Sequence, residues 1–117
     1  MAKRDPVERH LPMKPASFHV LLALADGPRH GYAIRASAEA LTNGGIRLWP
    51  ATLYGTIRQL SESGLIEPLE GANDPDDDAR RQYYQLTVLG RRVLSAETER
   101  LRALVDYARR TRAIAQA

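Results

Sequence analysis

A set of hydrogen-bonding side chains on one side of the segment 49–64 is the part of this sequence best suited to recognise another molecule. At helical spacing, the apolar side chains Leu53, Ile57 and Leu60 fall on one face. The outward face then carries Thr52, Thr56 and Arg58 or Gln59. Such groups can bond to the edges of nucleic-acid bases or to phosphate oxygens. The segment therefore predicts a surface that reads a nucleic acid.

The charges are unevenly distributed, although the formal net charge is only +3. Residues 66–78 hold six acids and no base, whereas residues 79–117 hold nine arginines against Glu97, Glu99 and Asp106. Arginine outnumbers lysine by fifteen to two. Its planar guanidinium can pair two phosphate oxygens at once, although high-GC codon usage gives the same bias. The basic C-terminal third favours a polyanionic partner.

Residues typical of catalysis or metal binding are sparse. His10, His19 and His30 fall in an N-terminal arm, a buried helix and a helix start, and their spacing does not suggest metal ligation. The acidic run 74–78 lacks the glycine and the closing glutamate of an EF-hand, so a solvated loop is the favoured interpretation. The sequence also lacks a glycine-rich phosphate loop and a nucleophile elbow. We therefore expect no enzyme, no metal site and no cofactor.

The composition is that of one folded domain, to which a long helix can be added. The sequence has 117 residues, of which 44% are apolar and 26% charged, and these shares are ordinary for globular proteins. It has no cysteine, which favours a reducing compartment. The N-terminus lacks the apolar part of a signal peptide, and the longest apolar run, 20–25, is far shorter than a membrane span. We expect a cytoplasmic protein without a membrane partner.

Three short helices are expected after a flexible N-terminal arm over residues 1–16. These helices span about 18–25, 30–42 and 50–63. Ser17 is the expected N-cap of the first helix, and His30 caps or packs in its turn at the start of the second. Pro50 suits the first position of the third helix, where a missing N–H has no cost, and Gly64 supplies its stop.

Two short strands, 65–69 and 81–86, are expected to form a β-hairpin around a turn-rich acidic loop. Pro68 restricts the first strand to a sheet edge or a short pairing. Phosphates would repel the acidic tip 74–78, so we expect the tip to point away from a nucleic acid while Arg80 and Arg81 grip its backbone.

The last segment, 87–117, predicts one long helix that pairs subunits. Thr87 is a fair N-cap and no proline follows it, so the helix should reach about Ala115, a length of ~40 Å. Apolar residues recur every seven positions, and a stripe of that length exceeds what the small preceding core can cover. Polar residues interrupt the repeat, so we expect helix packing between subunits rather than an extended coiled coil. The candidate dimer residues are Leu94, Leu101, Leu104, Val105 and Ala108.

Three helices, a hairpin and a trailing helix, in this order, are the elements of a winged helix-turn-helix protein, whose third helix enters the major groove. The expected fold class is mainly α with a small β-hairpin. It comprises a winged helix-turn-helix DNA-binding domain over 17–86 and a long C-terminal dimerisation helix over 87–117.

Several motifs, in the same order and at the same spacing, resemble the PadR family of transcriptional regulators. They are His30–Ile34, Pro50–Gly55, Leu60, Gly64–Ile66 and Arg80–Thr87 with Gly90. The match runs from about residue 17 to about residue 110. This resemblance implies a homodimeric repressor that binds an operator, often near its own gene, and that can release DNA when a small molecule binds.

The resemblance also implies which residues contact DNA. By position, Thr52 and Tyr54 match the start of the reading helix, and Arg80 and Arg81 match the basic end of the wing. Free N–H groups and the positive end of the helix dipole suit a phosphate at this helix start. The candidate DNA-binding residues are Ala51, Thr52, Tyr54, Gly55, Arg58, Arg80, Arg81 and Tyr83. The expected partners are double-stranded DNA with a pseudo-palindromic operator, half-sites about one helical turn apart, and a second copy of the chain.

Some assignments stay open at the level of sequence. Tyr54 and Tyr83 can each be core residues with a polar tip, which is the favoured interpretation for Tyr84. Trp49 is a poor N-cap, and packing on the core or its rim is favoured over a DNA contact. Two other functions remain: a sensor whose dimer cavity binds a small planar apolar or aromatic effector, and a winged helix used for protein contacts. The C-terminal helix offers Tyr107 but no tryptophan for an aromatic clamp.

Overall fold

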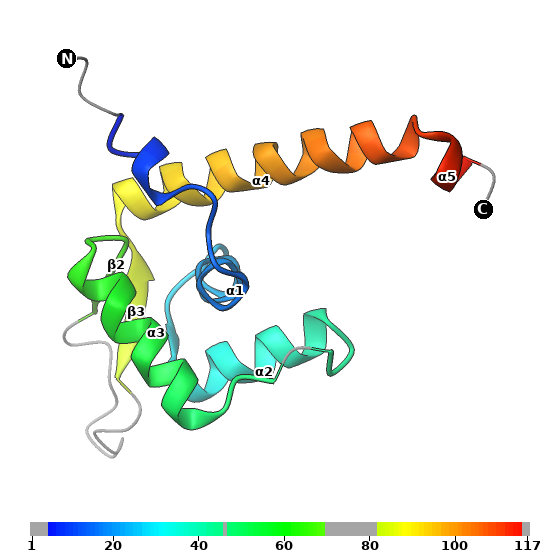
Figure 1. Cartoon of the computed structure of the whole chain (residues 1–117). Helices are drawn as coiled ribbons and strands as arrows, with labels where there is room; N and C mark the ends of the chain where they lie inside the picture. The colour runs from blue at the N-terminus through cyan, green and yellow to red at the C-terminus, as the bar shows by residue number, and fades with distance from the viewer. Residues whose placement is uncertain (1–4, 46, 70–81, 116–117) are drawn as a thin grey trace.

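The computed structural model describes residues 5–45, 47–69 and 82–115 (Figure 1). Its elements are, in chain order, η1 (Glu8–His10), α1 (Pro15–Ala23), β1 (Arg29–His30), α2 (Gly31–Leu41), α3 (Pro50–Glu62), β2 (Ile66–Pro68), β3 (Tyr83–Leu86), α4 (Val88–Arg109) and α5 (Arg112–Ala115). The fold is mainly helical with one small antiparallel sheet and a long C-terminal helix. The expected fold class is confirmed.

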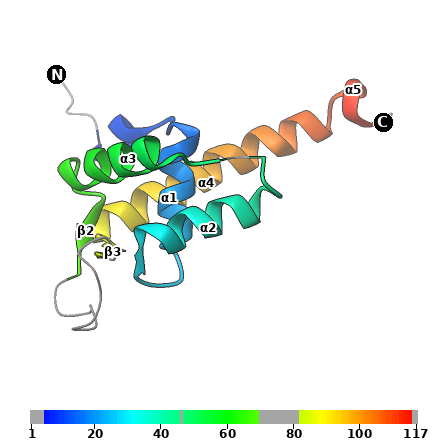
Figure 2. The ribbon, with the colours of Figure 1, turned by 90° about the horizontal axis from the view of Figure 1, so that it is seen from below.

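Helix α1 is the centre of the core. It packs against α2, α3 and α4, and Figure 2 shows it between these three helices. Val20, Leu21 and Leu24 on and just after α1 are almost completely buried, and each buried side chain of this size contributes about 2 kcal/mol to folding. The prediction that Ser17 caps this helix was wrong, because the helix begins at Pro15. A proline is well suited to this first position, where no backbone N–H is needed.

The sheet contains one strand more than the sequence analysis predicts. Its order is β1-β3-β2, and both pairings are antiparallel. β1 consists only of Arg29 and His30, which pair with Tyr84 and Tyr83. A strand of two residues is too short to show an alternating pattern. Pro68 lies on an edge strand, as predicted, because β2 is at the end of the sheet.

The N-terminal segment 5–14 lies against the start of α4, as the dark blue chain in Figure 1 shows. Val7 belongs to the buried core, and Leu11 and Met13 pack against it. The Met13 N–H donates a hydrogen bond of 2.8 Å to the Glu97 carboxylate on α4. The prediction of a flexible arm over 1–16 therefore fails for residues 5–16, since apolar contacts and a long-range hydrogen bond hold them. The domain boundaries stay a prediction.

The start of α4 is joined closely to the end of α3 and the start of β2. The Thr87 hydroxyl accepts a hydrogen bond from the Gly90 N–H and donates one of 2.6 Å to the Gly64 carbonyl. A Cβ atom placed on Gly90 would lie 1.9 Å from the Leu65 carbonyl oxygen, far inside contact distance. Thr87 is the N-cap, as predicted, and Gly90 permits a backbone approach that the sequence analysis does not foresee.

The C-terminal helix is shorter than predicted. α4 ends at Arg109, and a break at Arg110 and Thr111 separates it from α5. At the break the backbone N–H groups of Arg110 and Thr111 donate to the carbonyl three residues earlier instead of four. The Thr111 hydroxyl also donates a hydrogen bond to the Ala108 carbonyl. A threonine bonded in this way competes with the helical ladder. With 22 residues, α4 is still ~33 Å long, and its second half projects away from the core (Figure 1).

Candidate nucleic-acid interface

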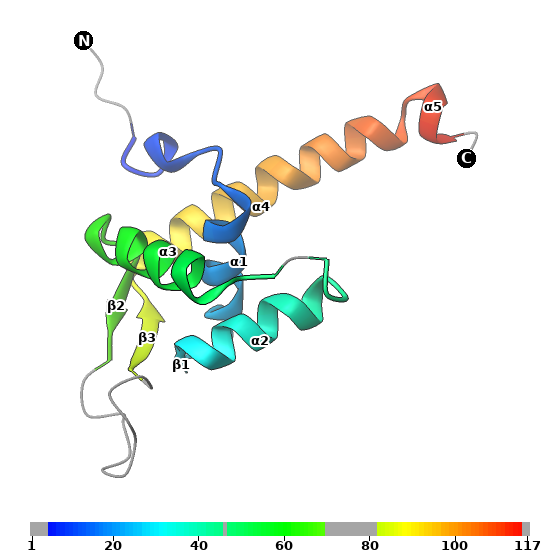
Figure 3. The same ribbon diagram turned by 60° about the horizontal axis from the view of Figure 1, so that its bottom comes forward.

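Helix α3 forms where the sequence predicts it, and for the predicted reasons. Pro50 stands at its first position, and Gly64, with a φ of 77°, follows its last turn. Leu53, Ile57 and Leu60 are buried, so the inward stripe is confirmed. In Figure 3 the strands β2 and β3 lead away from the C-terminal end of this helix.

The outward face of α3 is open along its first two turns. The exposed residues there are Ala51, Thr52, Tyr54, Gly55 and Arg58, with Gln59 beyond them. Gly55 has no atom within 4 Å of the place where a Cβ would stand, so another molecule can approach its backbone closely. Arg58 makes no ion pair within the described part of the chain. The first acid on the helix is Glu62, near its end.

Tyr54 packs against the start of α2 although 43% of it is exposed. Its ring lies 3.3 Å from the position that a Cβ on Gly31 would take. Burial raises the pKa of the neighbouring Tyr84, and the proximity of Tyr54 raises it further. Tyr84 packs against the core, as expected for it. Gly31 leaves room for the Tyr54 ring, and the sequence analysis does not foresee this contact because it joins two helices.

The wing strand β3 is held to the start of α2 by His30. The His30 Nδ1 accepts a hydrogen bond of 3.1 Å from the Ala33 N–H, which confirms the predicted cap. Its ring meets the half-buried Tyr83 ring edge-on, with 5.4 Å between the centroids. The His30 ring therefore packs against part of the Tyr83 side chain. Arg80, Arg81 and the acidic tip 74–78 lie outside the described residues.

Trp49 is more exposed than the sequence analysis predicts. It precedes α3 without a side-chain hydrogen bond to the helix, which confirms that it is a poor N-cap. However, 60% of Trp49 is exposed, so it does not lie within the core, and packing on the rim of the core stays a prediction. Pro50 stiffens the chain at this point, and the side chain stands beside the exposed first turn of α3. Tyr32, at the start of α2, is also exposed and was missed by the sequence analysis.

The candidate dimer residues follow α4 from the core into solvent. Leu94 is half-buried against the chain's own core, Leu101 and Ala108 are half-buried, and Leu104 and Val105 are 54% and 49% exposed. Tyr107 and Ile114 are also exposed. The distal half of α4 therefore presents more apolar surface than one chain can cover.

The described residues form neither a membrane-spanning helix nor a group of metal ligands. Over 5–45, 47–69 and 82–115, no helix is long and apolar enough to cross a membrane. In the same residues, no three histidine, cysteine, aspartate or glutamate side chains are grouped so that they could hold a metal ion.

Comparison with known proteins gives matches to transcriptional regulators. Residues 20–96 match the model of the transcriptional regulator PadR-like family. A transcriptional regulator of Mycobacterium tuberculosis is 35% identical over 91 residues, which cover 78% of this chain and 77% of that protein. An uncharacterised protein in a transposon of Streptomyces fradiae is 40% identical over 76% of this chain, which spans only 24% of that protein's length.

Solved structures share the fold. A transcriptional regulator from Clostridium thermocellum superposes with a TM-score of 0.67 at 20% identity, covering 96% of this chain and 99% of that one. Bacillus subtilis PadR, solved in complex with operator DNA, gives a TM-score of 0.61 at 20% identity over 73% of this chain and 47% of its own. Together with the family match, these findings identify a transcription regulator, not an enzyme: the chain belongs to the PadR-like family of transcriptional regulators.

Proposed function

We propose that this protein is a homodimeric, sequence-specific repressor that inserts the first turns of α3 into the major groove of its operator. The observation that carries the proposal is the outward face of α3. It combines exposed Thr52, Tyr54 and Arg58 with an open backbone at Gly55 and no acid before Glu62. Hydroxyl and guanidinium groups on such a face can bond to base edges, and first turns without acids avoid phosphate repulsion.

The wing supplies phosphate contacts in this proposal. Arg80 and Arg81 immediately precede the described end of the wing, and Tyr83 lies on β3. Guanidinium groups at these positions would fix the register of α3 on the DNA backbone without reading sequence. Ala51 lies in the first turn of α3, where free N–H groups and the helix dipole favour a nearby phosphate.

Two copies pair through α4 in this proposal. Leu94, Leu101, Leu104, Val105 and Ala108 would form the seam, and two-fold symmetry then requires a pseudo-palindromic operator. Exposed apolar side chains on the distal half of α4 support the pairing. We further propose that a small effector releases the repressor from DNA.

The first experiment selects a binding sequence from random DNA and maps bound sites in the genome. Binding to the selected duplex is then measured by fluorescence anisotropy over a range of salt concentrations. We expect affinity to fall steeply with salt, because bound phosphates release counterions. A chain that binds no duplex would instead favour a winged helix used for protein contacts, and one that binds every duplex equally would contradict sequence-specific recognition.

Replacing the wing arginines tests their separate role. Arg80→Ala and Arg81→Ala should each weaken binding to all duplexes and flatten the salt dependence by up to about one unit of slope. Arg112→Ala, a change of the same charge on α5, is the matched control and should leave the slope unchanged. Equal slopes for all three variants would contradict the assignment of the wing.

A further inference from the structure

Two exposed side chains, Arg47 and Trp49, precede α3 on either side of a buried residue. Leu48 between them belongs to the core. It fixes this segment to the rest of the protein, while the side chains before and after it lie at the surface. Arg47 and Trp49 together form what we call the lead-in pair.

The backbone holds the lead-in pair in one place. The Leu53 N–H donates a hydrogen bond of 2.8 Å to the Trp49 carbonyl, and Leu53 is itself buried. Pro50 restricts the residue before it to extended conformations, and the backbone of Trp49 is extended. Groups that are already held in place lose little conformational freedom when they bind another molecule. The lead-in pair is therefore suited to an interface.

The chemistry of the lead-in pair fits a DNA strand. In the described part of the chain, neither the Arg47 guanidinium nor the Trp49 indole N–H has a hydrogen-bond or ion-pair partner. A guanidinium can pair with two oxygens of one phosphate, and an indole offers a flat apolar face with one N–H donor. Along a DNA strand, phosphates alternate with deoxyribose rings. A guanidinium and an indole two residues apart thus match a phosphate and a neighbouring sugar.

The local charge also favours a polyanion. Residues 40–61 contain Arg47 and Arg58 and no acid. Glu39, which precedes this stretch on α2, pairs with Arg35 on the same helix. A strand of phosphates that approaches the start of α3 therefore meets positive charge and no acid from this stretch.

The lead-in pair lies where the border of the groove would be. The major groove is ~12 Å wide, and a helix with its side chains is ~10–12 Å across. A helix that enters the groove therefore fills it, and residues directly before its first turn meet the sugar–phosphate strand at the border. Trp49 is the N-cap of α3, and Arg47 precedes it by two residues.

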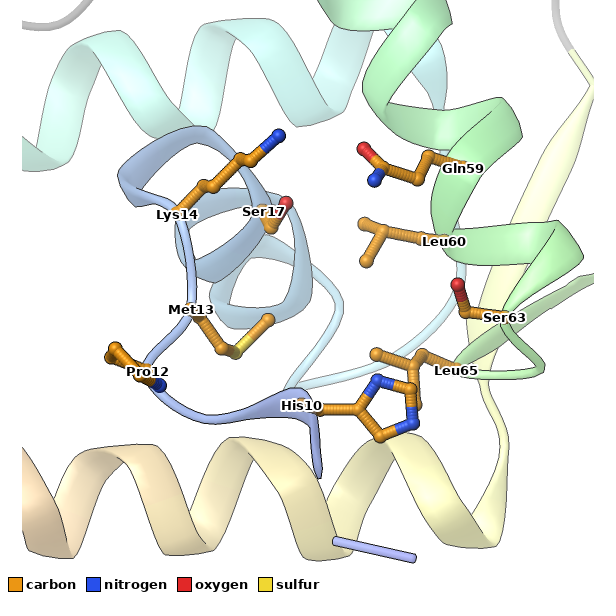
Figure 4. A pocket seen from close by; sticks show the side chains of 9 residues that line it. All are labelled: His10, Pro12, Met13, Lys14, Ser17, Gln59, Leu60, Ser63 and Leu65. Carbon is orange, nitrogen blue, oxygen red and sulfur yellow. The ribbon is translucent and has the colours of Figure 1, made fainter. Parts of the chain in front are cut away.

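The arrangement of the elements leaves the lead-in pair free. In Figure 4, Leu60 of α3 points toward Met13 and Ser17, so the N-terminal segment and α1 lie against another side of this helix. In Figure 1, the start of α3 and the distal half of α4 lie on opposite sides of the molecule. Two copies paired through α4 would thus leave the lead-in pair open to DNA.

We propose that the lead-in pair makes a second, sequence-independent contact with DNA. The Arg47 guanidinium pairs with a phosphate at the border of the half-site, and the Trp49 indole packs on the adjacent deoxyribose. The inference rests on the proposed function as a DNA-binding repressor. Since sugars and phosphates are the same in every sequence, the contact raises affinity for all duplexes and does not select among them.

The first test uses the fluorescence of Trp49, the only tryptophan in the sequence. Quenching by acrylamide measures the accessibility of the indole in the full-length protein, free and with a saturating amount of the selected duplex. The quenching constant should fall at least about twofold on DNA, because the bound strand covers the indole, and should recover when salt dissociates the complex. An equal quenching constant in the bound complex, as expected for an indole on the rim of the core, would overturn the proposal.

The second test locates the phosphate. Phosphates along the border of one half-site are replaced one at a time by neutral methylphosphonates. One replacement should weaken binding of the wild type about three- to tenfold and have no further effect on Arg47→Ala, because the charge that it met is already absent. Arg112→Ala, a change of the same charge on α5, should lose affinity as the wild type does. The proposal fails if Arg47→Ala and the wild type respond alike at every phosphate.

The third test compares two exposed apolar side chains. Trp49→Ala should weaken binding to the selected duplex and to an unrelated duplex by the same factor, at least about fivefold. Leu41→Ala removes an exposed apolar side chain at the end of α2 and should leave both affinities unchanged. Wild-type affinity in Trp49→Ala would contradict the indole contact. The first two tests do not need this variant, so they decide the question if it fails to fold.

The outcomes separate this contact from the proposed function. A protein that binds no duplex would overturn the proposed function and the contact with it. A protein that binds DNA while the quenching of Trp49 stays unchanged would overturn the contact alone.

Discussion

Thr52 is the side chain on which the proposed reading of sequence depends most directly. It is exposed on the first turn of α3, and its hydroxyl can both donate and accept a hydrogen bond. We predict that Thr52→Ala changes the preferred base at one position of each half-site and lowers affinity for the best duplex about five- to tenfold. The loss of one hydrogen bond to a base, of about 0.5–0.7 kcal/mol, in each of the two half-sites has this effect. Selection from random DNA with the variant measures both.

The control for Thr52 lies on another helix. Thr98→Ala removes the hydroxyl of an exposed threonine on α4, which bonds only to its own helix in the described structure. It should leave sequence preference and affinity as they are. If Thr52→Ala gives the same selected sequence as Thr98→Ala, Thr52 does not read bases.

Glu97 is a buried acid on α4 whose hydrogen bonds bear on the stability of the fold. Only 1% of it is exposed, and its carboxylate accepts hydrogen bonds from the Met13 N–H and from the Arg100 guanidinium. The Arg100 hydrogen bond is the main cause of a lowered Glu97 pKa, with help from Met13 and against the effect of burial. A carboxylate placed in this way holds the N-terminal segment on α4.

The lowered pKa determines the sign of a pH effect. As the pH falls, the unfolded chain takes up a proton on Glu97 before the folded chain does. The stability from this carboxylate is therefore fully present above the ordinary glutamate pKa and is lost as the pH falls through the lower pKa of the folded state. Urea unfolding from neutral pH to about pH 3 should show this loss in the wild type and a smaller loss in Glu97→Gln.

The Glu97→Gln variant should also be less stable at neutral pH, by about 1–2 kcal/mol, because it weakens two charge-assisted hydrogen bonds. Glu99→Gln is the matched control, since Glu99 is exposed and pairs with Arg102 on the surface. Its effect should be near zero, as for most surface ion pairs. Similar pH profiles for the two variants would contradict the role given to Glu97.

At the scale of elements, replacing a glycine by alanine should change the free energy of unfolding in opposite directions on two different helices. Gly90→Ala would place a Cβ against the Leu65 carbonyl, and we predict a loss of about 3 kcal/mol in the free energy of unfolding, typical of a severe overpacking. Gly55→Ala meets open space on α3. It should stabilise the free protein by about 0.5–1 kcal/mol through helix propensity.

Thermal and urea unfolding measure both effects. The same Gly55→Ala protein should bind DNA more weakly, because the methyl group keeps the backbone from approaching a strand. If the Gly55→Ala protein gains stability and keeps full DNA affinity, close approach at this position is not needed. A Gly90→Ala protein as stable as the wild type would show that Gly90 and Leu65 can move apart without loss of free energy of unfolding.

The elements that the sequence predicts well are those with local causes. Pro50, Gly64 and the stripe of Leu53, Ile57 and Leu60 determine α3 within a few neighbouring positions, so its bounds could be predicted. β1 has only two residues and forms because β3 pairs with it. Likewise, the contacts of Gly90 with Leu65 and of Glu97 with Met13 join residues far apart in sequence, which no periodic pattern reveals.

At the scale of the whole molecule, the shape is more extended than a compact domain of this length. The radius of gyration is 16.3 Å, whereas ~13 Å is expected for a compact domain of about this length. The distal half of α4 contributes to the difference, since it leaves the core and carries exposed Leu104 and Val105. An apolar helix that projects in this way is consistent with the proposed pairing of two chains.

The pairing can be tested on this helix. Leu101→Glu should place a charge within the seam and shift the protein from dimer to monomer in sedimentation, with a loss of operator affinity that depends on protein concentration. Ala103→Glu introduces the same charge at an exposed position outside the candidate seam and should leave a dimer. A Leu101→Glu protein that sediments as a dimer would contradict the seam.

The close contact between Gly90 and Leu65 has a geometric consequence for such a dimer. The Thr87 hydroxyl bonds to Gly64 and Gly90, and the Gly90 backbone lies against the Leu65 carbonyl, so we expect α4 to tilt together with the recognition helix. Over its ~33 Å, a tilt of about 10° moves the far end by about 6 Å. This displacement approaches the height of two base pairs, each ~3.4 Å. The stiffness of one glycine contact would thus set how strictly the dimer measures the distance between two half-sites.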